Sequence, residues 1–214
     1  MKLKTTKGMM FFIISFILLI IIALSGTIMR QVKEPKYKII YFQKNIEIRE
    51  YVPILVAQVA VTGERKKAIS SGFKILADYI FGNNKSVTSI NKTDPSAQQE
   101  GKRISMTAPV IQQELKDSNH WNVAFVMPEE YGIKTLPQPK NNQIEIISIP
   151  IKRYAVMRFS GLPTEYALGK HKKNLIDFIA KEKINARGTQ ILAFYNPPWT
   201  LPFLRRNEIM FEIE

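Results

Sequence analysis

The chain contains no cysteine, and this absence removes several classes of chemistry at once. Disulfides, thiolate catalysis, iron–sulfur clusters and cysteine-ligated zinc sites all require cysteine and are excluded. Histidine is scarce: His120 lies in a polar turn and His171 on the charged face of a predicted helix, neither at a metal-ligand spacing. A Ser-His-Asp order, a glycine-rich phosphate loop and an H-E-x-x-H motif are also missing. We therefore predict no catalytic residue, no metal site and no enzymatic activity.

Acidic residues are outnumbered by basic ones, 18 to 31, which gives a formal charge of +13. A surface of this sign attracts phosphates, anionic lipid headgroups and other anionic ligands, although dispersed charges also simply keep a domain soluble. The basic residues are dispersed, with short clusters at Lys170–Lys173 and Arg205–Arg206. No recognition helix, RNP motif or zinc finger accompanies them, so we expect no nucleic-acid partner.

One long segment near the N-terminus has no charge at all. As a helix, Met9–Met29 spans roughly 31 Å, about the thickness of the hydrocarbon core of a bilayer. Three lysines lie before it in residues 1–8, which favours a cytoplasmic N-terminus. We predict a single-pass transmembrane helix or signal anchor over 9–29, with the folded domain outside the cytoplasm. The alternative is a signal peptide cleaved before Gly26, which would release a secreted protein.

Residues 35–214 have the pattern of one α+β domain. Apolar residues recur at helical spacing in two segments, 64–81 (Ile69, Phe73, Leu76, Ile80) and 163–183 (Leu168, Leu175, Phe178, Ile179). Alternating or continuous apolar runs predict strands elsewhere. The polar stretch 83–103 and the proline-containing stretch 128–143 predict connectors. The expected strands cover 37–42, 46–51, 54–61, 104–112, 121–127, 144–149, 151–159, 190–195 and 208–213.

The domain also resembles itself at an offset of 98 positions, from Ile46 to Ile144. At this offset Ala57 falls on Ala155, and each copy continues into a predicted helix and a hairpin. We therefore predict two pseudo-symmetric β-α-β-β repeats that form a curved antiparallel sheet or distorted barrel with two helices. A cleft between two such halves is a common place for a small ligand.

Several short motifs, in a specific order, resemble the SOUL family of haem-binding-protein-like domains over residues 37–213. The implied fold, two β-α-β-β halves, agrees with the internal repeat. The motifs are the IEIREY stretch of Ile46–Tyr51, Tyr79 with Gly82 and Asn83, the MTAPV run of Met106–Val110, the turn at Phe159–Gly161, YNPP at Tyr195–Pro198 and RRNE at Arg205–Glu208.

The resemblance implies reversible, non-covalent binding of haem or a related tetrapyrrole, as a carrier or buffer without turnover. In one branch of the family a histidine after the I-R dipeptide has been proposed as an axial ligand, and here that position is Glu50. In another branch the tetrapyrrole lies against an apolar patch on the first helix. That mode places Lys66, Ser70, Phe73 and Ala77 on the ligand side.

Residues near the strand ends complete the candidate site that the resemblance implies. Lys66 or Arg206 would pair with a propionate of the ligand. Two alternatives stay open on the same fold: a non-haem envelope interaction module or binder of another amphipathic ligand, and an enzyme acting on tetrapyrroles. The protein partner is unknown. The further apolar walls are Met106, Phe125, Tyr195 and Trp199.

Overall fold

The computed structural model describes residues 10, 12–13, 32–86, 101–115 and 119–214. Among these residues, no helix is both long and apolar enough to cross a membrane. The membrane segment predicted over 9–29 lies outside the described residues, apart from positions 10, 12 and 13. Lys33–Glu214 forms one compact unit.

This unit is an α+β fold in which two α-helices, α2 and α4, each follow a run of strands. The predicted helices at 64–81 and 163–183 are present with ends within two residues of the prediction, and the strand Ile144–Ile149 has the predicted bounds. In chain order the elements are β1 (Tyr37–Gln43), β2 (Ile46–Tyr51), β3 (Ile54–Thr62), α2 (Arg65–Ile80), β4 (Asn84–Lys85), β5 (Val110–Glu114), β6 (His120–Val126), β7 (Gln138–Pro139), β8 (Ile144–Ile149), β9 (Lys152–Phe159), α4 (Glu165–Lys181), β10 (Ala186–Phe194), η1 (Pro202–Leu204) and β11 (Asn207–Ile213).

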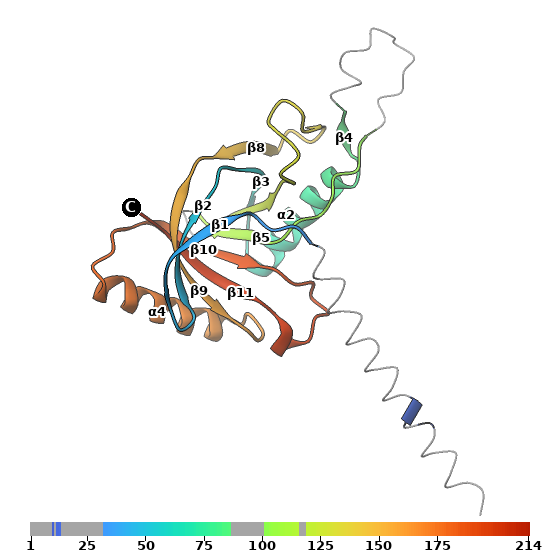
Figure 1. The fold of residues 1–214 in the computed structure, drawn as a ribbon. Coiled ribbons are helices and arrows are strands. Elements are labelled where there is room, and N and C mark those ends of the chain that lie inside the picture. Colours follow the sequence, from blue (N-terminus) through green and yellow to red (C-terminus); the bar gives the residue numbers. More distant parts are fainter. Residues whose placement is uncertain (1–9, 11, 14–31, 87–100, 116–118) are drawn as a thin grey trace, which may run out of the picture. The chain divides into compact units, whose positions relative to one another are not determined.

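Nine of the described strands form one sheet in the order β1-β2-β9-β11-β10-β5-β6-β3-β8. Every neighbouring pair is antiparallel, and the sheet curls into a half-barrel (Figure 1). The short strands β4 and β7 pair separately. From β2 to β8 the strand order is symmetric about its middle, between β10 and β5. Counted inward from the two ends, the matched strands are β2 with β8, β9 with β3, β11 with β6, and β10 with β5. This symmetry is one of strand order alone, and the duplication of the two halves remains a prediction.

Both helices pack on the same face of the sheet, each over its own part of it. Helix α4 packs its stripe from Leu168 to Ile179 against β2, β9, β10 and β11. Helix α2 packs Leu76, Tyr79 and Ile80 against β3, β6 and β8. Because side chains alternate along a strand, the intervening residues point to the opposite, concave face, where they form two smaller apolar clusters.

Three expectations about individual segments are corrected by the structure. The strand expected at 104–112 begins only at Val110, because Ile104 donates its backbone N–H to Ile80 and Pro109 has no N–H for a strand ladder. The predicted connector 83–103 contains β4, and the predicted connector 128–143 contains β7, which pairs with it. Phe73, expected within the buried stripe of its helix, is 37% exposed at the edge of that stripe.

Candidate functional site

The exposed side of α2 carries a row of residues at helical spacing. Lys66, Ser70, Phe73, Ala77 and Phe81 follow one another at intervals of three or four positions, so they share one side of the helix. Lys66 and Ser70 are exposed, Ala77 is half-buried, and Phe81, at the helix C-cap, is 52% exposed. The structure therefore brings together the four residues that the family resemblance selected on this helix. We call this row, with Phe81, the α2 stripe.

Beneath the α2 stripe, the sheet holds one of its aromatic rings in place. The ring of Phe73 meets that of Phe125 edge to face, with centroids 5.3 Å apart. Phe125 itself is buried, so it supports the stripe and adds little open surface to it. Gly72 brings the helix close to the sheet, because a Cβ at this position would lie 2.7 Å from Cγ2 of Val123. The aromatic surface thus rests on a tightly packed helix–sheet contact.

Basic groups lie at both ends of the α2 stripe. Lys66 is in the first turn of the helix. At the other end, the guanidinium of Arg103 lies 5.2 Å from the centroid of the Phe81 ring. Met106 is 51% exposed in the segment that passes this end, where Ile104 bonds to Ile80. A planar apolar ligand with carboxylates at its edge would meet aromatic surface in the middle and cations at the ends.

The remaining predicted site residues lie elsewhere in the structure. Tyr195 and Arg206 belong to the concave face, where the Arg206 guanidinium stacks 3.7 Å from the centroid of the Tyr195 ring. Trp199 is 79% exposed in the loop between β10 and β11. The α2 stripe and the Tyr195–Arg206 pair are therefore separate places, and a ligand on the helix would not contact both.

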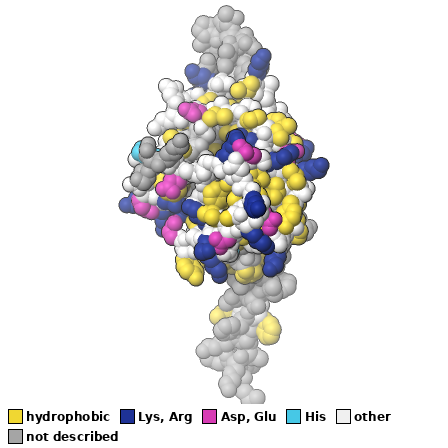
Figure 2. Space-filling model, turned by 90° about the vertical axis from the view of Figure 1, so that its left-hand side faces the viewer, with side chains coloured by type: hydrophobic (Ala, Val, Ile, Leu, Met, Phe, Trp, Pro, Cys, Tyr) yellow, Lys and Arg dark blue, Asp and Glu magenta, His cyan; other side chains and the backbone are white. Residues whose placement is uncertain are grey.

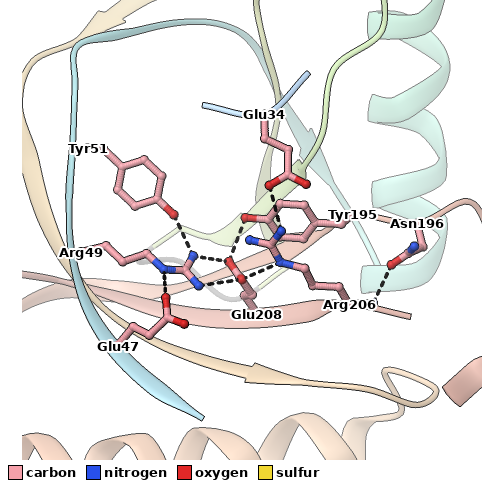
Figure 3. A network of polar contacts seen from close by, with 8 residues as sticks. All are labelled: Glu34, Glu47, Arg49, Tyr51, Tyr195, Asn196, Arg206 and Glu208. Carbon is pink, nitrogen blue, oxygen red and sulfur yellow. Dashed lines mark hydrogen bonds and ion pairs between the residues drawn. The ribbon is translucent and has the colours of Figure 1, made fainter. Parts of the chain in front are cut away.

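The concave face contains a buried ionic network that the sequence had not indicated (Figure 3). Arg49 on β2 and Glu208 on β11 are fully buried and form two hydrogen bonds, of 2.8 and 2.9 Å. Glu208 also accepts from Tyr195 Oη at 2.8 Å and from Arg206 Nε at 2.9 Å. Arg49 donates to Tyr51 Oη at 3.0 Å. Arg206 lies just before β11 and two residues before Glu208, so these two side chains pair along one segment of the chain.

The outer members complete the network. Arg49 Nε donates to Glu47 at 2.5 Å, and Arg206 pairs with Glu34 at 2.8 Å. Burial acts to raise the pKa of Glu208, but the hydrogen bonds and charges of the two arginines outweigh it and hold that pKa below its ordinary value. Glu208 is therefore an ionised carboxylate at neutral pH.

The histidines and Glu50 provide no obvious ligand for haem iron. The Glu50 carboxylate is already engaged, because it forms a 2.7 Å ion pair with Arg153 on the neighbouring strand. His120 is exposed at the start of β6. His171, expected on the charged face of its helix, is instead half-buried and stacked on Phe159 at 4.2 Å, and burial lowers its pKa. Among the described residues, no group of three or more His, Asp or Glu side chains is placed to hold a metal ion.

The α2 stripe thus offers an aromatic surface with a cation at each end. Lys66 of the helix is one of these cations, and Arg103 from the segment before β5 is the other. Comparison of the sequence with protein-family models matches the SOUL haem-binding protein family over residues 32–212. The chain belongs to the SOUL haem-binding protein family. Comparison with curated proteins gives no match.

Solved structures resemble this SOUL domain in fold at low sequence identity. The C-terminal domain of EcmrR is 14% identical, with a TM-score of 0.56, and the match covers 83% of this chain and 98% of that one. A hydrolase from Listeria innocua is 12% identical, with a TM-score of 0.53, covering 81% and 94% of the two chains. At such identities these likenesses show the fold alone, so the function of this SOUL domain has to be argued from its own residues.

Proposed function

We propose that this SOUL domain binds haem or a related tetrapyrrole non-covalently on the α2 stripe and acts as a carrier or buffer without turnover. The observation that carries the proposal is the exposed aromatic row between Phe73 and Phe81, with Lys66 and Arg103 at its two ends. Exposed aromatic surface with a cation at each end is suited to a flat apolar ring whose two carboxylates share one edge and pair with the cation at one of those ends. Family membership supports the same ligand class.

Titration with haemin, followed by absorption spectroscopy, tests the proposal directly. Residues 32–214 suffice for this measurement, because the compact unit contains all four of its apolar clusters. Ser70→Trp places a large ring on the α2 stripe and should weaken haemin binding by about tenfold or more. Ser71→Trp is the matched control, because Ser71 is also exposed but is turned about 100° around the helix.

A charge reversal at the edge of the stripe provides a second, independent test. Lys66→Glu should weaken haemin binding by about 1–3 kcal/mol, the scale of a lost charged hydrogen bond. Lys170→Glu on α4 is the control, because Lys170 is exposed on the other helix and makes the same change in net charge. Parent-like affinity in both Ser70→Trp and Lys66→Glu would place the ligand elsewhere. Absence of haemin binding by the parent would leave the non-haem binding module as the better proposal.

We further propose that residues 9–29 tether the domain to a membrane. The uncharged sequence of this segment supports the proposal, and so does its length, which matches a bilayer core. The full-length protein should sediment with membranes and require detergent for release. Recovery of a soluble form that begins near Gly26 would contradict the tether and favour a cleaved signal peptide.

A further inference from the structure

A pocket with a volume of about 290 Å³ lies on the concave face of the sheet, opposite the helices. It is lined by residues from both parts of the sheet, including β3, β6 and β8 on one side and β9, β10 and β11 on the other. Alternation along β6 makes the separation from the α2 stripe clear: Val123 and Phe125 face α2, whereas Ala124 and Val126 line the pocket. On the face that Figure 2 shows, hydrophobic side chains gather near the centre with charged side chains around them.

Three tyrosines form an aromatic wall on one side of this pocket. Tyr51 and Tyr154 meet edge to face at 5.6 Å, and Tyr195 is the third. The hydroxyl of Tyr51 accepts from Arg49, and that of Tyr195 donates to Glu208. These hydroxyls are therefore occupied by the buried ionic network, which orients the two rings. Burial raises the pKa of Tyr51 and of Tyr154 to about 12, so both remain neutral phenols.

The rest of the lining is mostly aliphatic and carries no net charge. Among the described residues that line the pocket, the charged ones are Lys152 and Glu212, and they form an ion pair of 2.5 Å with each other. Two of the lining amides are likewise paired, since Asn122 donates to Gln58 at 2.8 Å. An anionic or cationic ligand would have to break the Lys152–Glu212 pair or remain without a partner, which is costly in an apolar site.

We propose that this pocket is a second small-molecule site, for an uncharged, mostly apolar molecule with a flat aromatic ring. The site is distinct from the α2 stripe in position and in chemistry. The stripe offers cations for carboxylates, whereas the pocket offers a tyrosine wall, aliphatic contacts and mutually paired charges. The proposal does not depend on haem binding.

Matched fluorescent probes test both the site and the charge preference. N-phenyl-1-naphthylamine is uncharged, and 8-anilino-1-naphthalenesulfonate is the same ring system with a sulfonate. The neutral probe should bind residues 32–214 saturably and about tenfold or more tightly than the sulfonate. Acridine in its neutral form and N-methylacridinium extend the comparison to a cation. Equal or tighter pocket binding of either charged member would overturn the assignment to uncharged ligands.

Filling the pocket with a side chain should weaken this binding. Ile149→Trp is suited to this, because Ile149 lines the pocket from the edge strand β8. Ile111→Trp fills it from the central strand β5, should the edge variant fold poorly. Ile151→Trp is the matched control, because Ile151 is 63% exposed in the turn after β8 and does not line this pocket. Each folded pocket variant should bind the neutral probe about tenfold or more weakly than the parent.

Measuring both haemin binding and probe binding in each of these variants separates the two proposals. Ser70→Trp should weaken haemin binding and leave the affinity for the neutral probe unchanged. Ile149→Trp should weaken probe binding and leave the affinity for haemin unchanged. A parent that binds the probe but not haemin would refute the haem proposal alone. Probe binding that is absent from the parent, or that survives both Ile149→Trp and Ile111→Trp, would overturn the pocket proposal.

Discussion

The pair of Arg49 and Glu208 offers the most direct test of how this sheet is held together. Both side chains are fully buried, and Glu208 accepts four hydrogen bonds in all. Glu208→Gln keeps the shape of the side chain but removes its charge, and it turns an amide N–H₂ toward guanidinium donors. Removing one partner of a buried ion pair costs about 3–5 kcal/mol. Because a domain is typically stable by about 5–15 kcal/mol, this loss would be a large fraction of the total.

Urea unfolding followed by tryptophan fluorescence measures this loss, since Trp121 is buried in the native state. With a urea dependence of about 1–3 kcal/mol per molar, the midpoint should fall by about 1 M or more. Glu165→Gln is the matched control, because Glu165 is 81% exposed in its ion pair with Arg65 and should contribute at most about 1 kcal/mol.

The single variants Arg49→Met and Glu208→Leu and the double variant Arg49→Met/Glu208→Leu together form a mutant cycle. Removing both charges leaves no unpaired buried ion between them, so the double variant should be more stable than the sum of the single losses predicts. A loss below about 1 kcal/mol for Glu208→Gln, or strictly additive losses in the cycle, would refute the reasoning.

The pH dependence has a defined sign. The pKa of Glu208 lies below its ordinary value of 4.5 in the folded state, so the unfolded chain takes up the proton more readily. The stability that Glu208 contributes is therefore present above pH 4.5 and is lost as the pH falls through the folded value. Glu208→Gln should remove this part of the acid sensitivity.

Two further predictions concern the helix contacts and the iron. Gly72→Ala should destabilise the domain, because its Cβ would lie 2.7 Å from Cγ2 of Val123. Gly169→Ala on α4 meets open space and should stabilise the domain by about 0.5–1 kcal/mol. Thermal melting of both variants checks this, and a stabilised Gly72→Ala would contradict it. Any haem complex should lack the low-spin spectrum that two strong protein ligands would give. Its spectrum should be unchanged in His120→Ala and in His171→Ala. A sharp low-spin spectrum that is lost in either variant would show histidine ligation.

Much of the fold follows from local patterns in the sequence. The stripe of Leu168, Leu175, Phe178 and Ile179 predicted α4, and all four side chains are buried against the sheet. Local periodicity suffices there because a helix buries one face regardless of which strands lie beneath it. The start of strand β5 was harder to predict, since residues 104–109 are apolar enough for a strand. In the structure their backbone groups bond to other segments, as the Ile104 N–H does to the Ile80 carbonyl.

The concave face could not be predicted in the same way, because its parts are far apart in the sequence. Arg49 and Glu208 are separated by 159 positions and lie on strands that are joined only through β9. A partial signal was available in the run from Ile54 to Val61, which is apolar at almost every position. Such a run indicates a strand that is covered on both faces, and therefore a second apolar surface besides the one under the helices.

Stability alone does not explain why a buried ion pair stands beside an apolar pocket. Well-packed hydrophobic residues of similar volume are often equally stable, so we expect the Arg49–Glu208 pair to have a further role in the shape of the pocket wall. Its hydrogen bonds to Tyr51 and Tyr195 indicate that it fixes the orientation of the pocket wall. Arg49→Met/Glu208→Leu should therefore bind N-phenyl-1-naphthylamine several-fold more weakly than the parent, even where its stability is largely regained. Fluorescence titration of this folded variant, beside Glu165→Gln, makes the comparison. Parent-like affinity would show that packing alone holds the two rings and that the ion pair has no part in shaping the pocket.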